Sequence, residues 1–408
     1  MELLRIILVF ALIIVLLVRK VELWATLAIG GVTLGLLCRL PWVKIGGEFF
    51  HGLLEPKTIK LVGALFFILL LSEIMRETGG MRKMIDSFGA ITRDLRAVVA
   101  LLPAMIGLMP IMGGALVSAP LVVEASDALR LSPERRTFLN YWFRHIWEYF
   151  LPTYPGVILT SALLGVSLRD IAAYNSPLTL AAIGGGIAFG FRGVGKGEEG
   201  KWGKGIVEGI RGVLFSLFPL LVVLVMVILL KVELVYSLML AIGIELLRGR
   251  IGWRKTKEMV LRNLSSAKLL LSVIMVVYFQ RMLGATQAVG SFHDSLCQVG
   301  ISPLFLLVVL PFAIGLMTGV TIAFVGVAFP ILLPVMQGRD NLLLYLMFAY
   351  VSGFCGVLLS PLHLCLVLTK DYFRAEMRKV YRLLFPPVSA VWGIGALIFS
   401  FHVVGIGG

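Results

Sequence analysis

Long apolar runs separated by short charged segments dominate the chain. About 20 consecutive apolar residues make a helix that crosses the hydrocarbon core of a bilayer. Ten segments fit such helices, some of them with help from flanking polar residues or local thinning of the bilayer. They cover residues 3–18, 23–38, 58–75, 138–165, 177–191, 213–230, 234–247, 263–283, 342–368 and 384–404. The pattern predicts an all-α polytopic membrane protein.

Two further apolar stretches predict a different arrangement. Residues 97–123 and 295–338 contain no Asp, Glu, Lys or Arg, and each has Pro or Gly near its middle. The second stretch is long for one helix and short for two crossings with a turn. Non-helical backbone at membrane depth requires protein or a water-filled cavity around it. We therefore predict two re-entrant hairpins, at about 98–126 and 302–334, in addition to the ten spans.

The composition agrees with this interpretation. Apolar residues make up 59% of the 408 residues and charged residues 15%, and the mean hydropathy is +0.97. A soluble globular chain has more charge and fewer apolar residues, a disordered chain is less apolar, and an outer-membrane barrel has short alternating segments. The four cysteines form no C-x-x-C pair, so we interpret them as small core residues rather than metal ligands.

The net charge of +14 lies mostly in the short segments between spans, which argues against nucleic-acid binding. With the N-terminus outside, the predicted inner segments hold 26 Lys and Arg and the outer ones 9. This asymmetry follows the positive-inside rule and places both termini outside the inner membrane of a prokaryotic cell. The first apolar run lacks a small-residue cleavage site, so we expect a retained helix rather than a signal peptide.

Parts of the first half recur about 210 positions later. Lys20-Val21-Glu22-Leu23 recurs as Lys231-Val232-Glu233-Leu234, Trp42 matches Trp253, and Leu102-Pro103 matches Leu310-Pro311. Several matches in order at nearly constant spacing indicate an internal repeat. We assign residues 1–191 and 213–408 to the two repeats and 192–212 to a cytoplasmic linker. Because each repeat holds five spans and a hairpin, the second lies upside down, as in many secondary transporters.

The hairpin tips are the first candidate binding site. Glycine lets the backbone approach a ligand closely, helix N-termini favour anions, and hydroxyl groups donate and accept hydrogen bonds. The alternative is that these small residues only permit close helix packing. The candidates for substrate binding at the tips are Gly113, Gly114, Ser118, Thr318, Gly319 and Thr321.

A second candidate is the break in the span at 138–165. Pro152 and Pro155 interrupt it, and Ser360-Pro361, close to His363, occupies the corresponding place in the second repeat. Proline removes a donor and frees an upstream carbonyl, and such carbonyls can bind a coupling Na⁺. A plain proline kink is the alternative. The break supplies Pro152, Pro155, Ser360 and His363 as candidates for ion coupling.

Charged residues within the same span form the third candidate. Arg144, His145 and Glu148 lie where charge is costly and often functional. Arg144 could bind a carboxylate of the substrate, and His145 or Glu148 could carry a coupling proton. The alternative is a structural pair between Arg144 and Glu148, which are spaced i, i+4. His145 and Glu148 alone are too few ligands for zinc, so no metal site is predicted. The matching positions in the second repeat are uncharged: Gly353, Phe354 and Val357.

One stretch of the chain and the first hairpin carry a resemblance to a known family. The stretch reads Phe143-Arg144-His145-Ile146-Trp147-Glu148-Tyr149, then Pro152-Thr153-Tyr154-Pro155-Gly156, and the hairpin runs from Met109 to Pro120. They resemble an uncharacterised prokaryotic membrane family, the domain of unknown function 401. The layout is similar to the ion transporter superfamily, which includes divalent-anion, citrate and gluconate permeases. The resemblance implies elevator-like transport by a homodimer.

We therefore expect an ion-coupled secondary transporter of a small, anionic solute that works by alternating access. The coupling ion would be Na⁺ or H⁺, the lipid bilayer and the solute would be its partners, and no other cofactor is expected. The chain contains no H-E-x-x-H, G-x-S-x-G or P-loop motif, so we expect no enzyme. A passive anion channel and an intramembrane enzyme are the alternatives.

Overall fold

The computed structural model describes residues 2–92, 94–109, 114–195, 205–264, 267–286, 302–336 and 341–404. In this part of the chain every regular element is a helix. The first half contains α1 (Glu2–Val18), α2 (Leu23–Leu37), α3 (Trp42–Leu54), α4 (Pro56–Glu77), α5 (Gly80–Ile91), α6 (Leu95–Gly107), α7 (Gly114–Ala128), α8 (Pro133–His145), α9 (Pro155–Leu164) and α10 (Leu168–Gly190). The second contains α11 (Ile206–Leu224), α12 (Leu234–Arg248), α13 (Trp253–Asn263), α14 (Ala267–Ala285), α16 (Pro303–Thr318), α17 (Thr321–Met336), α18 (Leu342–Leu359), α19 (Leu364–Phe373) and α20 (Met377–Val404).

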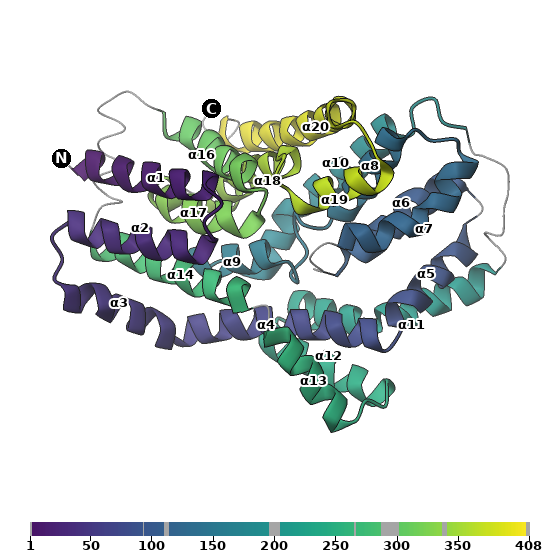
Figure 1. Cartoon of the computed structure of the whole chain (residues 1–408), viewed down its shortest axis with the longest axis horizontal. Helices are drawn as coiled ribbons and strands as arrows, with labels where there is room; N and C mark the ends of the chain where they lie inside the picture. Colours follow the sequence, from purple (N-terminus) through teal and green to yellow (C-terminus); the bar gives the residue numbers. More distant parts are fainter. Residues whose placement is uncertain are drawn as a thin grey trace.

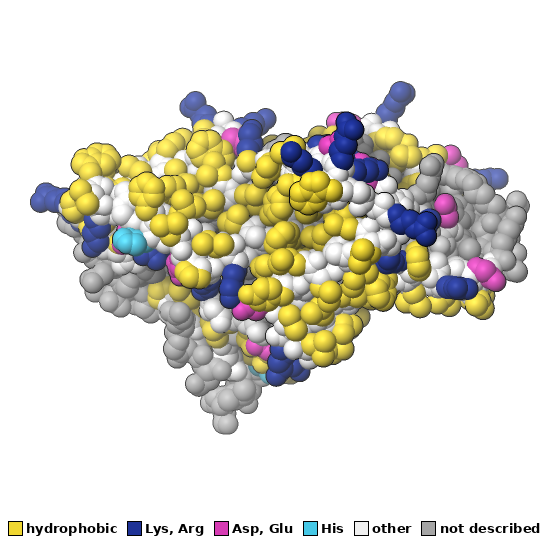
Figure 2. Space-filling model, turned by 90° about the horizontal axis from the view of Figure 1, so that it is seen from below, with side chains coloured by type: hydrophobic (Ala, Val, Ile, Leu, Met, Phe, Trp, Pro, Cys, Tyr) yellow, Lys and Arg dark blue, Asp and Glu magenta, His cyan; other side chains and the backbone are white. Residues whose placement is uncertain are grey.

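The helices have the length and composition of a membrane protein. Among the described residues, five helical segments are long and apolar enough to cross a bilayer: Pro56–Glu77, Ile206–Leu229, Ala267–Ala285, Leu342–Phe373 and Met377–His402. Hydrophobic side chains cover much of the face shown in Figure 2, and Lys and Arg side chains gather along its upper margin. Leu180, Val207 and Leu229 are among the exposed large hydrophobic residues. The prediction of an all-helical chain with helices long and apolar enough to cross a membrane is confirmed, whereas the count of ten spans stays a prediction.

Three of the segments expected to be plain connections contain helices. Residues 39–60, 76–97 and 248–262 include α3, α5 and α13, respectively. These helices are amphipathic, and α13 carries several charged residues, so a search for long apolar runs passes over them. The predicted linker at 192–212 also overlaps a helix, because α11 begins at Ile206.

Helices of the two halves begin at matching positions and exchange their packing partners. α2 begins at Leu23 and α12 at Leu234, while α3 begins at Trp42 and α13 at Trp253. α2 packs against α14 and α12 against α4, as Figure 1 shows; likewise α9 packs against α17 and α19 against α7. Helices that begin at matching positions thus have matching partners in the opposite half.

Two ion pairs between side chains follow the same exchange of partners between the two halves. Lys60 Nζ lies 2.8 Å from a carboxylate oxygen of Glu233, and Lys268 Nζ lies 2.6 Å from one of Glu22. Glu22 and Glu233 hold the same place in the repeated Lys-Val-Glu-Leu sequence. Because both pairs are exposed and screened by solvent, they stabilise the fold little, and they mark the correspondence between the halves.

Glycines bring helix backbones together at two equivalent crossings. A Cβ atom added to Gly107 of α6 would lie 2.2 Å from the carbonyl oxygen of Arg144 in α8. A Cβ atom on Gly315 of α16 would lie 2.2 Å from the carbonyl oxygen of Gly353 in α18. Small residues allow this approach between apolar helices. The crossings hold α8 and α18 in the core, where Trp142 and Phe354 are buried.

Candidate functional site

Two interrupted helices meet at the centre of the molecule. α8 ends at His145 and α9 begins at Pro155, while α18 ends at Leu359 and α19 begins after His363. Pro152, Pro155 and Pro361 lie in or beside these interruptions and lack the N–H that a continuous helix uses. The predicted break is present, and in the first half it extends over residues 146–154.

Each break is supported by a tyrosine from the other half. Tyr141 of α8 donates a hydrogen bond of 3.1 Å to the carbonyl of Leu358, near the end of α18. Tyr350 of α18 donates one of 2.8 Å to the carbonyl of Glu148, just after α8 ends. These carbonyls lose their helical partners at the break, and a buried carbonyl without a donor is costly. The two bonds are equivalent under the exchange that relates the halves.

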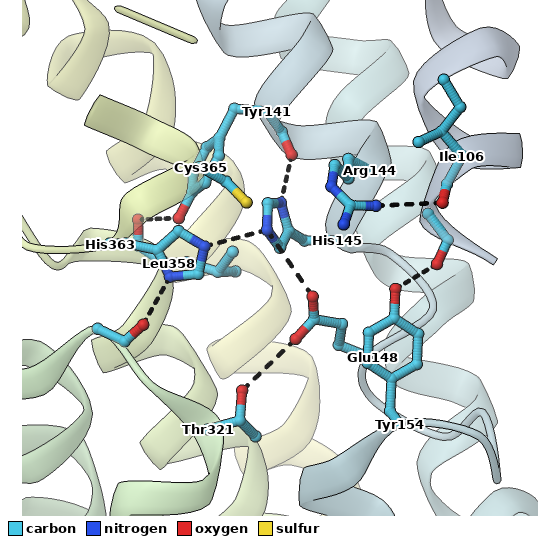
Figure 3. Close-up of polar contacts among 12 residues, drawn as sticks. Ile106, Tyr141, Arg144, His145, Glu148, Tyr154, Thr321, Leu358, His363 and Cys365 are labelled. Carbon is cyan, nitrogen blue, oxygen red and sulfur yellow. Dashed lines mark hydrogen bonds and ion pairs between the residues drawn. The ribbon is translucent and has the colours of Figure 1, made fainter. Parts of the chain in front are cut away.

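His145 and His363 face each other in this central region (Figure 3). Their Nε2 atoms are 3.1 Å apart, and the residues are 2% and 9% exposed. His145 Nδ1 lies 2.6 Å from the carbonyl oxygen of Tyr141, and His363 Nδ1 lies 2.8 Å from that of Gly319. Carbonyl oxygens only accept hydrogen bonds, so both Nδ1 atoms carry the ring hydrogen.

This arrangement leaves a lone pair on each Nε2 atom when both rings are neutral. Two lone pairs that face each other at 3.1 Å repel. Moving the hydrogen of one ring to Nε2 only transfers the repulsion to its Nδ1 atom and the neighbouring carbonyl oxygen. A cation between the two rings, either a proton or a metal ion, removes the conflict. The histidine pair is therefore a place for positive charge.

Glu148 and Thr321 extend the cluster toward α17. A carboxylate oxygen of Glu148 lies 3.7 Å from His145 Nε2, and Thr321 donates to the other oxygen over 3.4 Å. Thr321 is the first residue of α17 and packs against Gly156 of α9, where a Cβ would lie 2.3 Å from its methyl carbon. The start of α17 is thus in contact with the break of the other half.

Arg144 lies beside the start of α7. Its side chain is buried, and Nη1 donates to the carbonyl of Ile106 over 3.2 Å. A Cβ on Gly114, the first residue of α7, would lie 2.6 Å from Nη2. The first N–H groups of a helix carry partial positive charge. A guanidinium and a helix N-terminus side by side favour an anion.

The structure separates the tip residues into two groups. Gly114, Gly319 and Thr321 line the cluster, and Gly319 has a φ of +65° that favours glycine. Ser118 and Thr318 instead donate to carbonyls of their own helices, at 3.1 and 2.7 Å. Such bonds satisfy the hydroxyls within their own helices. Gly113 lies outside the described residues.

The residues of the break also divide by role. Ser360 accepts a hydrogen bond from the N–H of Leu362 and shapes the turn, and Pro152 and Pro155 define the limits of the other break. Arg144 and Glu148 do not share a helical face, because α8 ends at His145. The i, i+4 geometry on which the structural pair was predicted is therefore absent at this place in the described structure.

Sequence reasoning missed Cys365. Its sulfur and the ring nitrogens of His145 and His363 lie within 4.8 Å of one another. The cysteine had been interpreted as a small core residue. The available signal was its position two residues after His363, in a segment that the repeat matches to the break near His145.

A family model described as a protein of unknown function, DUF401, matches residues 3–402. The chain belongs to this family. Membership was expected from the stretch around His145 and is confirmed. A comparison with curated proteins finds no match. The family description assigns no activity, so the function is argued from the site itself.

Proposed function

We propose that the chain is an ion-coupled secondary active transporter of a small anionic solute, working by alternating access. The observation that carries the proposal is the meeting of two broken helices around buried ionisable side chains. Arg144, His145 and Glu148 are at most slightly exposed, with Glu148 the most accessible at 13% of its side chain. Ionisable groups at such depth in a membrane protein are costly and mark substrate or ion pathways.

The solute would bind between Arg144 and the start of α7. The guanidinium provides two parallel donors for a carboxylate or a similar planar anion. Gly114 lets the guanidinium lie directly against the start of α7, because a Cβ there would collide with Arg144. The coupling ion, Na⁺ or H⁺, would bind on the other side of His145, where Glu148 supplies carboxylate oxygens.

The relation between the halves supports alternating access. Inverted repeats let a transporter adopt two similar states that open to opposite sides. The exchanged helix partners and the paired bonds of Tyr141 and Tyr350 are the relations that such repeats produce. The helix pairs α6–α7 and α16–α17 would be the re-entrant hairpins, one in each repeat.

Two cavities lie at the exchanged ion pairs. One of about 750 Å³ includes Glu22 and Lys268 in its lining and extends to Thr318 and Val320 at the turn between α16 and α17. The other, of about 680 Å³, has Lys60 and Glu233 in its lining. A cavity that reaches the turn of a hairpin is typical of a transporter that is open to one side of the membrane.

Reconstituted protein tests the proposal. The full chain is purified, and its melting temperature is measured with a panel of small organic and inorganic anions, with and without Na⁺ and at two pH values. A ligand that binds the folded state raises the melting temperature. Proteoliposomes are then assayed for uptake of the stabilising anion against its own gradient, driven by a Na⁺ or pH gradient.

Matched arginine variants connect uptake to the site. We expect Arg144→Gln to abolish binding and uptake, and Arg136→Gln, a control on the same helix, to retain both. Downhill flux that ignores the Na⁺ and pH gradients would contradict coupling and favour a channel. Chemical conversion of the added compound would favour an enzyme. Equal uptake by the two variants would remove Arg144 from the binding site.

A further inference from the structure

We propose that His145, His363 and Cys365 bind one transition-metal ion, with Glu148 as the fourth ligand. The proposal does not depend on the transport proposal, because a metal ion could serve structure, catalysis or transport. It extends the sequence analysis, in which His145 and Glu148 were too few for a metal site. The fold supplies two more ligands from a segment 218 residues further along the chain.

The distances fit a tetrahedral ion. Zinc binds imidazole nitrogen at about 2.0–2.1 Å, so two nitrogens on one tetrahedral ion lie about 3.3–3.4 Å apart. The two Nε2 atoms are 3.1 Å apart, and Cys365 Sγ lies within 4.8 Å of both. Glu148 is 3.7 Å from His145 Nε2. The ligand atoms of His145, His363 and Cys365 can reach one ion with shifts of a few tenths of an ångström to about one, and Glu148 beside His145 would complete the set.

The surrounding hydrogen bonds are those that metal-binding histidines require. Such a histidine usually donates its second ring N–H to a carbonyl or carboxylate, which fixes the ring and directs the other nitrogen at the metal. His145 does this to Tyr141 and His363 does it to Gly319. The backbones of Gly319 and His363 are in close contact, because a Cβ on Gly319 would lie 2.7 Å from the backbone nitrogen of His363.

The charge of the ligand set suits a buried divalent ion. A thiolate and a carboxylate carry two negative charges, and the two imidazoles are neutral, so a divalent ion makes the centre neutral. Burial of a compensated ion is far less costly than burial of separate charges. A proton shared by the two Nε2 atoms would relieve their repulsion without using the Cys365 sulfur, which also lies within hydrogen-bonding reach of His145 and Arg144. The metal accounts for all of the ligands at once.

The ligand types also select the class of metal. Imidazole and thiolate favour Zn²⁺, Co²⁺ and similar ions over Mg²⁺ and Ca²⁺, which prefer oxygen ligands.

The internal repeat does not require these residues for packing, since the positions that match His363 and Cys365 are Tyr154 and Gly156. The cavity of about 750 Å³ comes near this region, because Val320 and Leu362 line it and Leu362 precedes His363 in the chain.

Cobalt binding tests the proposal on the full chain in detergent. The protein is purified with a reducing agent, stripped with a chelator and titrated with Co²⁺. A thiolate-to-cobalt charge-transfer band and intense tetrahedral visible bands should saturate at one ion per chain. Added Zn²⁺ should remove them.

Cysteine variants locate the ion. We expect Cys365→Ser to abolish the charge-transfer band and to weaken Zn²⁺ binding by about tenfold or more. Cys355→Ser, a buried control whose sulfur contacts the carbonyl of Val388, should keep both. His363→Gln should weaken binding in the same way. Melting temperatures without metal show whether each variant is folded.

Two results would overturn the proposal. One is an absence of saturable Co²⁺ or Zn²⁺ binding by the folded wild-type chain, which would leave a proton as the cation between the histidines. The other is equal binding by wild type and Cys365→Ser, which would place the ion elsewhere. Neither result bears on anion uptake in proteoliposomes, so failure of the metal site and failure of the transport proposal can be told apart.

Discussion

Replacing Gly107 with alanine should force apart two helix backbones that are in contact. The added Cβ would lie 2.2 Å from the carbonyl oxygen of Arg144, and that atom belongs to the backbone of a core helix. No side-chain rotation can relieve the contact, so α6 must move away from α8. The same reasoning applies to Gly315, where the opposing atom is the carbonyl oxygen of Gly353 at 2.2 Å.

The size of the effect follows from two opposing terms. Overpacking of a well-packed core costs about 1–3 kcal/mol, and a clash with backbone belongs at the upper end. Alanine is favoured over glycine inside a helix by about 1 kcal/mol, which offsets part of the cost. The net loss is about 2 kcal/mol, which for a chain of 408 residues corresponds to a fall in melting temperature of roughly 2–3 °C by the per-residue entropy of unfolding of soluble domains.

Thermal unfolding of the purified protein in one detergent measures the difference. Gly63→Ala is the matched control, because Gly63 lies inside α4 and a Cβ there would have no other atom within 4 Å. Its melting temperature should stay the same or rise slightly. Melting temperatures for Gly107→Ala and Gly315→Ala equal to that of Gly63→Ala would refute the close crossings.

The other predictions concern bonds between the halves. Tyr141→Phe and Tyr350→Phe should each cost about 1–3 kcal/mol, because each leaves a buried carbonyl of the opposite half without its donor. Tyr236→Phe, at an exposed tyrosine, should change the melting temperature little, and an equal loss there would refute the assignment. Lys60→Ala, which removes an exposed pair with Glu233, should leave the melting temperature nearly unchanged, and a clear fall would contradict its surface character.

Apolar runs and proline were sufficient to predict the main elements around the site. The charge-free stretches contain the helices α6, α7, α16 and α17, whereas their re-entrant course stays a prediction, and Pro152 with Pro155 predicted the interruption after α8. The repeated Lys-Val-Glu-Leu sequence marked the starts of α2 and α12. Amphipathic helices such as α13 were missed because their apolar residues do not form a continuous run.

The composition of the central cluster could be predicted only in part. Arg144, His145 and Glu148 were recognisable because charge is rare within an apolar span. The contact between His145 and His363 could not be predicted, because 218 residues separate them. No local sequence pattern gives the angle between the two broken helices. Cys365 was missed for a related reason: an isolated cysteine in an apolar helix is ordinary until the fold brings two imidazoles beside it.

Several helices that pack against each other are synthesised at widely separated times, because they lie far apart in the sequence. The ribosome completes α2 and α4 long before it makes α14 and α12, against which they pack. Until then the first half must stay in the bilayer with these faces covered by lipid or by the insertion machinery. Long-range pairings of this kind are slow to form. The central cluster can form only after α19 has been synthesised, because His363 directly precedes this helix and Cys365 lies within it. The site is therefore completed late in folding.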